Sequence, residues 1–268
     1  MRTNRIVWAI LLVGLGFLFL ANNLGFINVN VWGLIWPVFL ILMGISFLMG
    51  TKSGSVDVVV EEGSIGLDGA EGATVRVKHG AGSLVVDSNA DAGTLASGTF
   101  AHGLDARVKR VGTQLDVVMQ PETPVFPDMV FPWNWASRKG LQWEFGFTRE
   151  IPLNLVFETG AAEATIDLTE LQVKDLKLST GASSTTLKLP AGAGFTNLKM
   201  EAGAASIVVQ VPEGVAARVE ASAGLATVSV NQNRFPKMNG YYQSADYEEA
   251  ANKVNIQIET GVASIEIN

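Results

Sequence analysis

The sequence predicts an all-β domain, a single-stranded β-helix or solenoid-like stack of coils, preceded by a two-helix transmembrane hairpin. A glycine-led motif repeats: Gly160, Gly181, Gly203 and Gly224 lie 21, 22 and 21 residues apart. A fixed interval of this size is typical of stacked repeats. The residues after each glycine alternate between apolar and polar, which is the pattern of a half-buried strand. The first fifty residues hold two long, uncharged, apolar runs.

Each repeat is expected to bury one stripe of side chains. The fourth and sixth residues after each glycine are apolar or small: Ala164, Thr185, Ile207 and Val228, then Ile166, Leu187, Val209 and Val230. One such strand is unstable alone, but stacked strands share a continuous core. An antiparallel sandwich with similar turns is the alternative. We favour stacked coils because the motif itself repeats, and not only the strand pattern.

The repeated glycines are expected to form the coil corners, where a sharp turn favours positive φ. Small residues after them would let neighbouring corners approach closely. The motif also occurs before the regular repeats and at the end of the chain. The expected corner glycines are Gly80, Gly160, Gly181, Gly203, Gly224 and Gly261.

Residues 1–50 are expected to form the membrane hairpin, with helices over 6–24 and 31–49. A spanning helix needs about 20 apolar residues, and a pair joined by a tight link satisfies its backbone internally. A cleaved signal peptide and a soluble core hairpin are weaker alternatives. Arg2, Arg5 and Lys52 flank the hairpin on one side, which predicts that both termini lie in the cytoplasm. An outward-facing domain is the main competitor.

Residues 51–268 are expected to form the stacked-β domain. Short strands before residue 90 read as degenerate early coils, and 106–111 with 114–119 read as a hairpin around Gly112. Residues 231–253 read as a polar loop that leads to a closing coil, which ties the C-terminus into the stack.

The segment 120–152 interrupts the repeats with prolines and aromatic residues. The favoured interpretation is an inserted loop and a strand, 141–147, whose aromatic side chains cap the stack. The alternative is a surface for a partner or for the membrane interface. Its candidate residues are Phe131, Trp133, Trp135, Arg138, Lys139 and Trp143.

The composition excludes several kinds of site. The net charge is −7, and no basic stripe suggests nucleic-acid binding. Cysteine is absent, which excludes thiolate chemistry. Only two histidines occur, so few side chains are available for a histidine-rich metal site or a histidine-based catalytic triad. His79, beside a turn, is expected at the surface. Asp167 and Lys188 are expected to pair on a solvated face. We therefore expect no enzyme activity, no cofactor and no metal.

Two parts of the chain resemble known bacterial families. LLVGLGFLFLANNLGFI and VWGLIWPVFLILMGISFLMG resemble the transmembrane region of LiaI- and LiaF-like proteins. STGASSTTLKLP, EAGAASIVVQVPEGVAARVEASAGLATVSV and the closing YYQSADYEEAANKVNIQIETGVASIEI resemble LiaF-type and adhesin-like toast-rack β domains. The resemblance implies a regulator of envelope-stress signalling, anchored in the bacterial inner membrane, that contacts a membrane sensor kinase. It carries over no catalytic residues, and LiaF itself is usually drawn with more spans.

Three hypotheses for function follow. The first is a non-enzymatic scaffold in the lipid bilayer that regulates a membrane protein partner. The second is an outward-facing adhesin-like or wall-contact module, and the third is a polysaccharide-acting β-helix enzyme, which would need clustered carboxylates. Nucleic acid is not expected as a partner, and assembly with further copies of the chain is left open.

Overall fold

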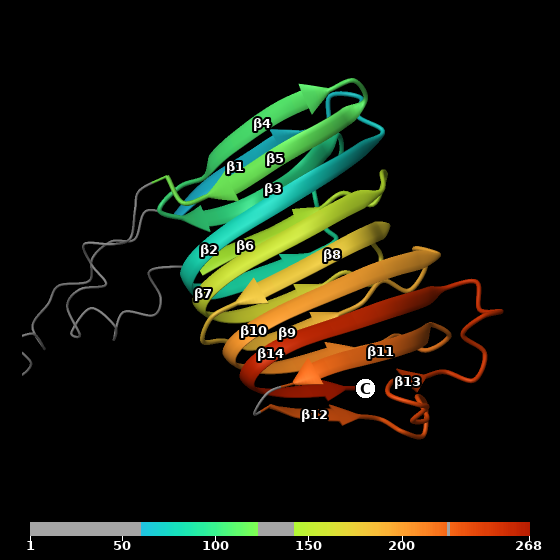
Figure 1. Ribbon diagram of the computed structural model, residues 1–268. Helices are drawn as coiled ribbons and strands as arrows, with labels where there is room; N and C mark the ends of the chain where they lie inside the picture. Colours follow the sequence, from blue (N-terminus) through green and yellow to red (C-terminus); the bar gives the residue numbers. More distant parts are fainter. Residues whose placement is uncertain (1–59, 123–141, 224–225) are drawn as a thin grey trace, which may run out of the picture. The chain divides into compact units, whose positions relative to one another are not determined.

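The computed structural model describes residues 60–122, 142–223 and 226–268, and this part of the chain forms fourteen β-strands (Figure 1). Their bounds are β1 Val60–Gly66, β2 Gly72–Asp87, β3 Thr94–Ala101, β4 Asp105–Val111, β5 Gln114–Gln120, β6 Gln142–Phe147, β7 Leu153–Asp167, β8 Val173–Thr180, β9 Ser184–Lys188, β10 Phe195–Gln210, β11 Ala216–Ala223, β12 Thr227–Val230, β13 Tyr242–Gln243 and β14 Lys253–Ile267. Within these residues no helix has the length and apolar character needed to cross a membrane. The expected spans 6–24 and 31–49 lie outside the described residues.

Each coil of the stack consists of two strand segments, called arms here, that are joined at the corner glycine. The first arm of β7 pairs in parallel with β8, and its second arm, beyond Gly160, pairs in parallel with β9. Both β8 and β9 then pair with β10. The coils thus form two parallel-stranded faces that meet at the glycine corners, while turns such as 168–172 close the opposite edge. The stacked-coil prediction is confirmed for this region.

The core lies between the two faces and follows the predicted alternation. Ile166, Leu187 and Val209 are each at most 1% exposed, and they stack in successive coils. The first arms supply a second row, with Phe157, Leu178 and Met200 in register and fully buried. Parallel strands one rung apart lie about 4.8 Å from each other, so each apolar row forms a continuous column.

The corner glycines are required for a different reason from the one expected. None of the described corner glycines has positive φ. Glycines with positive φ occur in other turns, for example Gly112 and Gly194. Instead, a β-carbon on Gly181 would lie 3.0 Å from the carbonyl oxygen of Gly160, and one on Gly203 would lie 3.0 Å from that of Gly181. The glycines therefore permit close stacking of corners and not a left-handed turn.

The order of coils in space differs from their order in the sequence. The closing strand β14 pairs with β10 on one side and with β11 and β12 on the other. In Figure 1 the red β14 therefore lies between β10 and β11. The loop 231–252 makes this possible, because it carries the chain back over β11, where Phe235 and Tyr247 are buried. The C-terminus is tied into the stack as expected, since Asn268 accepts a hydrogen bond from the Val211 N–H and donates one to Val209.

The early strands correct a second expectation. β1 pairs antiparallel with β3, and β3 pairs antiparallel with β6, so these strands are not coils of the stack. β2 is an early coil as expected, because both of its arms pair in parallel with β7. The turn at Asp68 and Gly69, both at positive φ, reverses the chain between β1 and β2. The hairpin of β4 and β5 around Gly112 is confirmed, and β5 adds to β2 in parallel.

Candidate functional site

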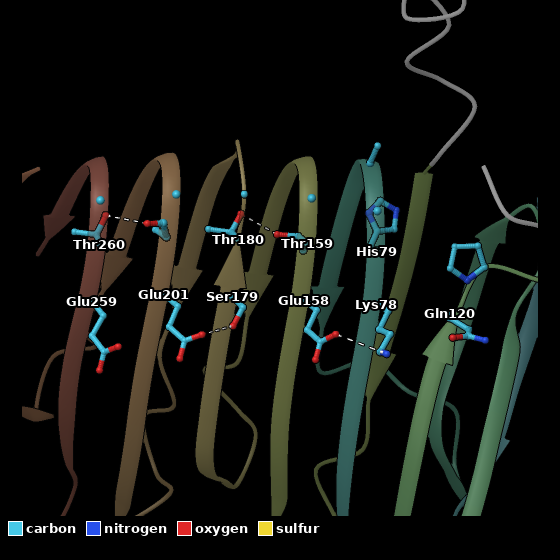
Figure 2. Close-up of a pocket in the computed structure, with 18 of the residues that line it drawn as sticks. Lys78, His79, Gln120, Glu158, Thr159, Ser179, Thr180, Glu201, Glu259 and Thr260 are labelled. Carbon is cyan, nitrogen blue, oxygen red and sulfur yellow. Dashed lines mark hydrogen bonds and ion pairs between the residues drawn. The ribbon is translucent and has the colours of Figure 1, made fainter. Parts of the chain in front are cut away.

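A groove of about 1250 Å³ runs along the glycine corners and crosses five coils (Figure 2). Its floor is the row Gly80, Gly160, Gly181, Gly203 and Gly261. These glycines are in line because the strands that carry them pair in register through both arms. Gly224 lies outside the described residues. Because glycine has no side chain, the groove exposes backbone at its base.

Hydroxyl groups stiffen the corner beneath the groove. The residue before each glycine turns inward, and Thr159 donates a hydrogen bond of 2.9 Å to Thr180. Thr180 in turn donates to Ser183 at 2.6 Å, and Thr260 donates to the carbonyl oxygen of Ala202 at 3.2 Å. Each bond links one coil to the next or to its own second arm, so the corner is held without a longer turn.

His79 occupies the equivalent position in the first coil, and the expectation that it lies at the surface is wrong. Its side chain is 2% exposed, and its ring meets the edge of Trp143 with the centroids 5.4 Å apart. It is buried because the position before each corner glycine faces the core, in register with Thr159. Only the stacking register reveals this.

The residue two positions before each glycine points outward and forms one wall of the groove. This row holds Lys78, Glu158, Ser179, Glu201 and Glu259. The sequence carries the signal in its repeated Glu-Thr-Gly, Ser-Thr-Gly and Glu-Ala-Gly triplets. The row was not predicted, because the faces of the coil were assigned only from the residues that follow each glycine.

The carboxylates of this row are engaged with basic side chains of the same face. Glu158 pairs with Arg76 at 3.3 Å, and Glu201 pairs with Lys177 at 2.9 Å. Lys199 bridges Glu201 at 3.4 Å and Glu259 at 3.2 Å. The wall is therefore an ion-pair ladder of mixed sign, and it is open to solvent.

The ladder shifts the pKa of two of its members. A hydrogen bond from Lys177 lowers the pKa of Glu201, and further bonds from Ser179 and Lys199 outweigh the opposing effect of partial burial. The pKa of Lys199 is raised, first by its hydrogen bond to Glu259 and then by Glu201. Both shifts favour the charged forms, so Glu201 and Lys199 do not form an acid–base pair poised near neutral pH.

Among the described residues, no three histidine, aspartate or glutamate side chains gather as metal ligands. The groove instead offers exposed backbone, hydroxyl groups and paired charges over a length of five coils. Such a surface suits the docking of an extended element or of another protein's edge, where many small contacts add up.

The predicted partner surface is only partly described. Phe131, Trp133, Trp135, Arg138 and Lys139 lie outside the described residues. Trp143 does not belong to any such surface, because its side chain is 1% exposed and its indole Nε1–H donates to the carbonyl oxygen of Ala101 at 3.1 Å. Its ring packs edge-on against Phe100. An indole with a satisfied N–H inside a β core is a packing residue.

The predicted outward ladder after the glycines is present. Lys188 bonds to Asp167 at 2.9 Å across neighbouring coils, as expected from the repeat interval. Both side chains are more than a third exposed. This pair lies on the second face, away from the groove, and it belongs to the solvated surface of the stack.

Three described ends of the chain reach the edge that carries the groove. Val60 is placed at this edge by its neighbours across three strands. Val60 pairs with Ala101, and the adjacent residue Phe100 pairs with Trp143. Trp143 in turn pairs with Leu84, which is four residues beyond Gly80. Pro121 and Glu122 line the groove, and Gln142 pairs with Ser83. The described residues Val60, Glu122 and Gln142 therefore all lie at the glycine-corner edge.

The fold and this edge define a class: a two-faced β solenoid that presents a corner groove on a chain with an apolar N-terminal region. Residues 53–210 match the family model for the N-terminal domain of toast_rack, and residues 6–48 match the LiaI-LiaF-like transmembrane region. The chain belongs to the toast-rack family. It is a membrane-associated protein, because it joins this domain to that transmembrane region.

One of the two solved structures below shows the same fold. A candidate cell adhesion protein from Clostridium sporogenes ATCC 15579 superimposes with a TM-score of 0.68 at 19% identity, over 79% of this chain and 99% of its own. A candidate adhesin from Bacteroides fragilis NCTC 9343 aligns with a TM-score of 0.26 at 7% identity, over 80% of this chain and 98% of its own. No curated protein matches the sequence.

Proposed function

We propose that this protein is a non-enzymatic scaffold that regulates cell-envelope stress signalling through contact with a membrane sensor protein. Residues 6–24 and 31–49 cross the inner membrane as a hairpin, with both termini in the cytoplasm. The β domain binds the partner, and the glycine-corner groove is its contact surface. The observation that supports this most strongly is the union, in one chain, of the LiaI-LiaF-like transmembrane region and the toast-rack domain.

The geometry of the groove supports a binding role over a chemical one. Its acidic wall residues are tied to basic neighbours, so no carboxylate pair is left to act as acid and base. Glu122 lines it, and Val60 lies at the same edge of the domain.

Regulation requires that the domain bind one state of the sensor more tightly than the other, since equal affinity for both states shifts neither. Small residues in the two apolar segments, among them Gly14, Gly33 and Gly44, would allow close packing beside the sensor's own helices. The β domain would then add the contacts that distinguish the two states.

A site-specific photocrosslinker tests the partner surface in the full-length chain. It is placed at Ala204, which is exposed next to the groove residue Gly203, or at Glu213, which is exposed in the turn at the opposite edge. We expect a membrane sensor protein to be captured from Ala204 and not from Glu213. Equal capture from both sites, or no membrane protein from either, would contradict the proposal.

The likeness in fold to a candidate cell adhesion protein favours a second function, an outward-facing adhesin-like or wall-contact module on the same anchor. The two functions place the β domain on opposite sides of the membrane. The chain has no cysteine, so Met238→Cys, at an exposed position in the loop 231–252, introduces the sole thiol. Labelling by an impermeant maleimide in intact cells would establish the outward orientation, and labelling only after lysis the cytoplasmic one.

A further inference from the structure

The two ends of the stack are finished differently. At one end, β11 is covered by β13 and by the loop 231–252, whose Tyr241 and Tyr247 rings stack on Arg218. At the other end, the outermost strands are β4 on one face and β1 on the other. β4 pairs with β5 and β1 pairs with β3, and no described residue pairs with the outer edge of either strand.

Within the described residues, the core reaches this second end without a covering layer. Ala106 packs against the core, and Val108, two residues along the same strand, is 50% exposed. Val111 and Val60, at the end of β4 and at the start of β1, are 63% and 55% exposed. Arg110 crosses the end by donating to the carbonyl oxygen of Asp68 at 2.6 Å, but it leaves these valines uncovered.

The two open edges carry opposite charges. β4 reads Asp-Ala-Arg-Val-Lys-Arg-Val, with Arg107 and Lys109 exposed, whereas β1 begins Val-Glu-Glu with Glu61 and Glu62 exposed. Charges on an edge strand usually prevent it from pairing with a copy of itself. Here they disfavour β4 against β4 and β1 against β1, and they favour β4 against β1.

The directions of the strands allow that pairing in a closed dimer. Asp105 lies opposite Gln120 and Val60 opposite Ala101, so β4 and β1 both start at the glycine-corner edge and run away from it. A two-fold axis parallel to the strands exchanges the two faces and preserves this direction. It would set β4 of each copy parallel to β1 of the other. The interface would then contain two equivalent β4–β1 pairs, one on each face, and would be self-complementary.

We propose that this end of the β domain binds a second copy of the chain, so that β4 of each protomer adds in parallel to β1 of the other. Glu62 of one copy then lies beside Arg107 and Lys109 of its partner, and Val108, which is on the same side of β4 as the core residue Ala106, is covered by β1 of that partner. The axis leaves both Val60 residues on the same side, as two chains held in one bilayer require. This inference does not depend on the identity of a signalling partner.

Cysteine crosslinking in the native membrane tests the geometry, since the chain has no thiol of its own. Two differently tagged full-length chains, Glu62→Cys and Arg107→Cys, are co-expressed and treated with a short bis-maleimide. We expect a crosslinked dimer that carries both tags and no dimer from Glu62→Cys alone. Thr227→Cys, exposed on β12 at the opposite end, is the matched control and should stay monomeric.

A charge reversal tests the same interface in detergent solution by light scattering. Arg107→Glu with Lys109→Glu should weaken dimerisation about tenfold or more, because like charges then face each other. Adding Glu61→Lys and Glu62→Lys to that chain should restore it, which also shows that the reversed chains fold. A wild-type chain that is monomeric by light scattering, no crosslinked dimer with both tags, self-crosslinking of Glu62→Cys, or a failed rescue would each overturn the proposal.

Discussion

The carbonyl oxygen of Gly80 occupies the place where a β-carbon on Gly160 would lie. This contact starts a row in which each corner glycine faces the carbonyl oxygen of the glycine in the preceding coil. The same oxygens accept hydrogen bonds across the row: Gly160 from Ala182 at 3.0 Å, and Gly181 from Ala204 at 2.9 Å. A side chain at the corner would therefore cost both space and a coil-to-coil hydrogen bond.

The first prediction concerns this row. Gly160→Ala should lower the free energy of unfolding of the β domain by about 1 to 3 kcal/mol, because the added methyl group forces the corners apart. Gly80→Ala is the matched control, since nothing lies within 4 Å of its β-carbon position. Denaturant unfolding followed by near-UV circular dichroism measures both. Equal destabilisation by the two substitutions would show that the glycines serve backbone conformation and not close stacking.

The second prediction tests the position of the closing strand. Val254 on β14 is buried between Thr196 of β10 and Ala217 of β11, whereas Val228 on the terminal strand β12 is only partly buried. Val254→Ala should cost about 2 kcal/mol of unfolding free energy, and Val228→Ala less than about 1 kcal/mol. If coils stacked in sequence order, the closing strand would lie outermost and the two costs would be similar.

The third prediction concerns the buried hydroxyl groups beneath the groove. Thr180→Val removes the acceptor of the Thr159 hydroxyl and should cost about 1 to 3 kcal/mol, because a buried donor then has no partner. Thr165→Val, an exposed position on β7, is the control and should stay within about 0.5 kcal/mol, because it removes no buried hydroxyl. Thermal unfolding of both variants gives the comparison. A neutral Thr180→Val would show that the hydrogen-bond chain does not hold the corner.

The fourth prediction concerns acid. Burial alone would raise the pKa of Asp167, but hydrogen bonds from the Thr169 hydroxyl, from Lys188 and from the Thr169 N–H outweigh it and lower the pKa. A carboxyl group whose pKa is lower in the folded state stabilises the fold above its unfolded pKa, and this contribution is lost as pH falls through the folded pKa. Asp167→Asn should therefore reduce stability at pH 7 by less than about 1 kcal/mol, and by progressively less below about pH 4.

Denaturant titrations at pH 7 and pH 3 measure this difference. The exposed Glu163→Gln on the same strand is the control for a change in net charge. Each titration gives the difference in unfolding free energy between pH 7 and pH 3. If Glu163→Gln reduces this difference as much as Asp167→Asn does, the effect comes from net charge and not from the Asp167–Lys188 pair.

Much of the repeat could be predicted from the sequence, because each coil is local. The interval of 21 or 22 residues sets which residues become neighbours, and so Ile166, Leu187 and Val209 could be assigned to one buried column. The same interval placed Lys188 beside Asp167. The membrane association also came from local composition, through two apolar runs that match a known transmembrane region.

The candidate site could be predicted only in part. The glycine row was expected, but its reason was not, since a close approach between coils depends on their separation in space and not on local turn preference. The groove wall with Glu158, Glu201 and Glu259 was missed, although it repeats in the sequence. His79 was expected at the surface, and packing across strands buried it. Trp143 was a candidate only in the alternative interpretation of 120–152 as a partner surface, and its burial agrees with the favoured interpretation, in which the aromatic side chains of this strand cap the stack.

What the sequence determined by itself is therefore the coil: its length, its buried stripe and its corner, all of which follow from period-two alternation and a fixed interval. What only the tertiary structure decided is how the coils are ordered and ended. β14 pairs with β10 because the loop 231–252 is long enough to return the chain to that position, and any strand with the same alternation satisfies the same ladder. Alternation specifies a face, while the choice of neighbour depends on contacts between residues far apart in the chain.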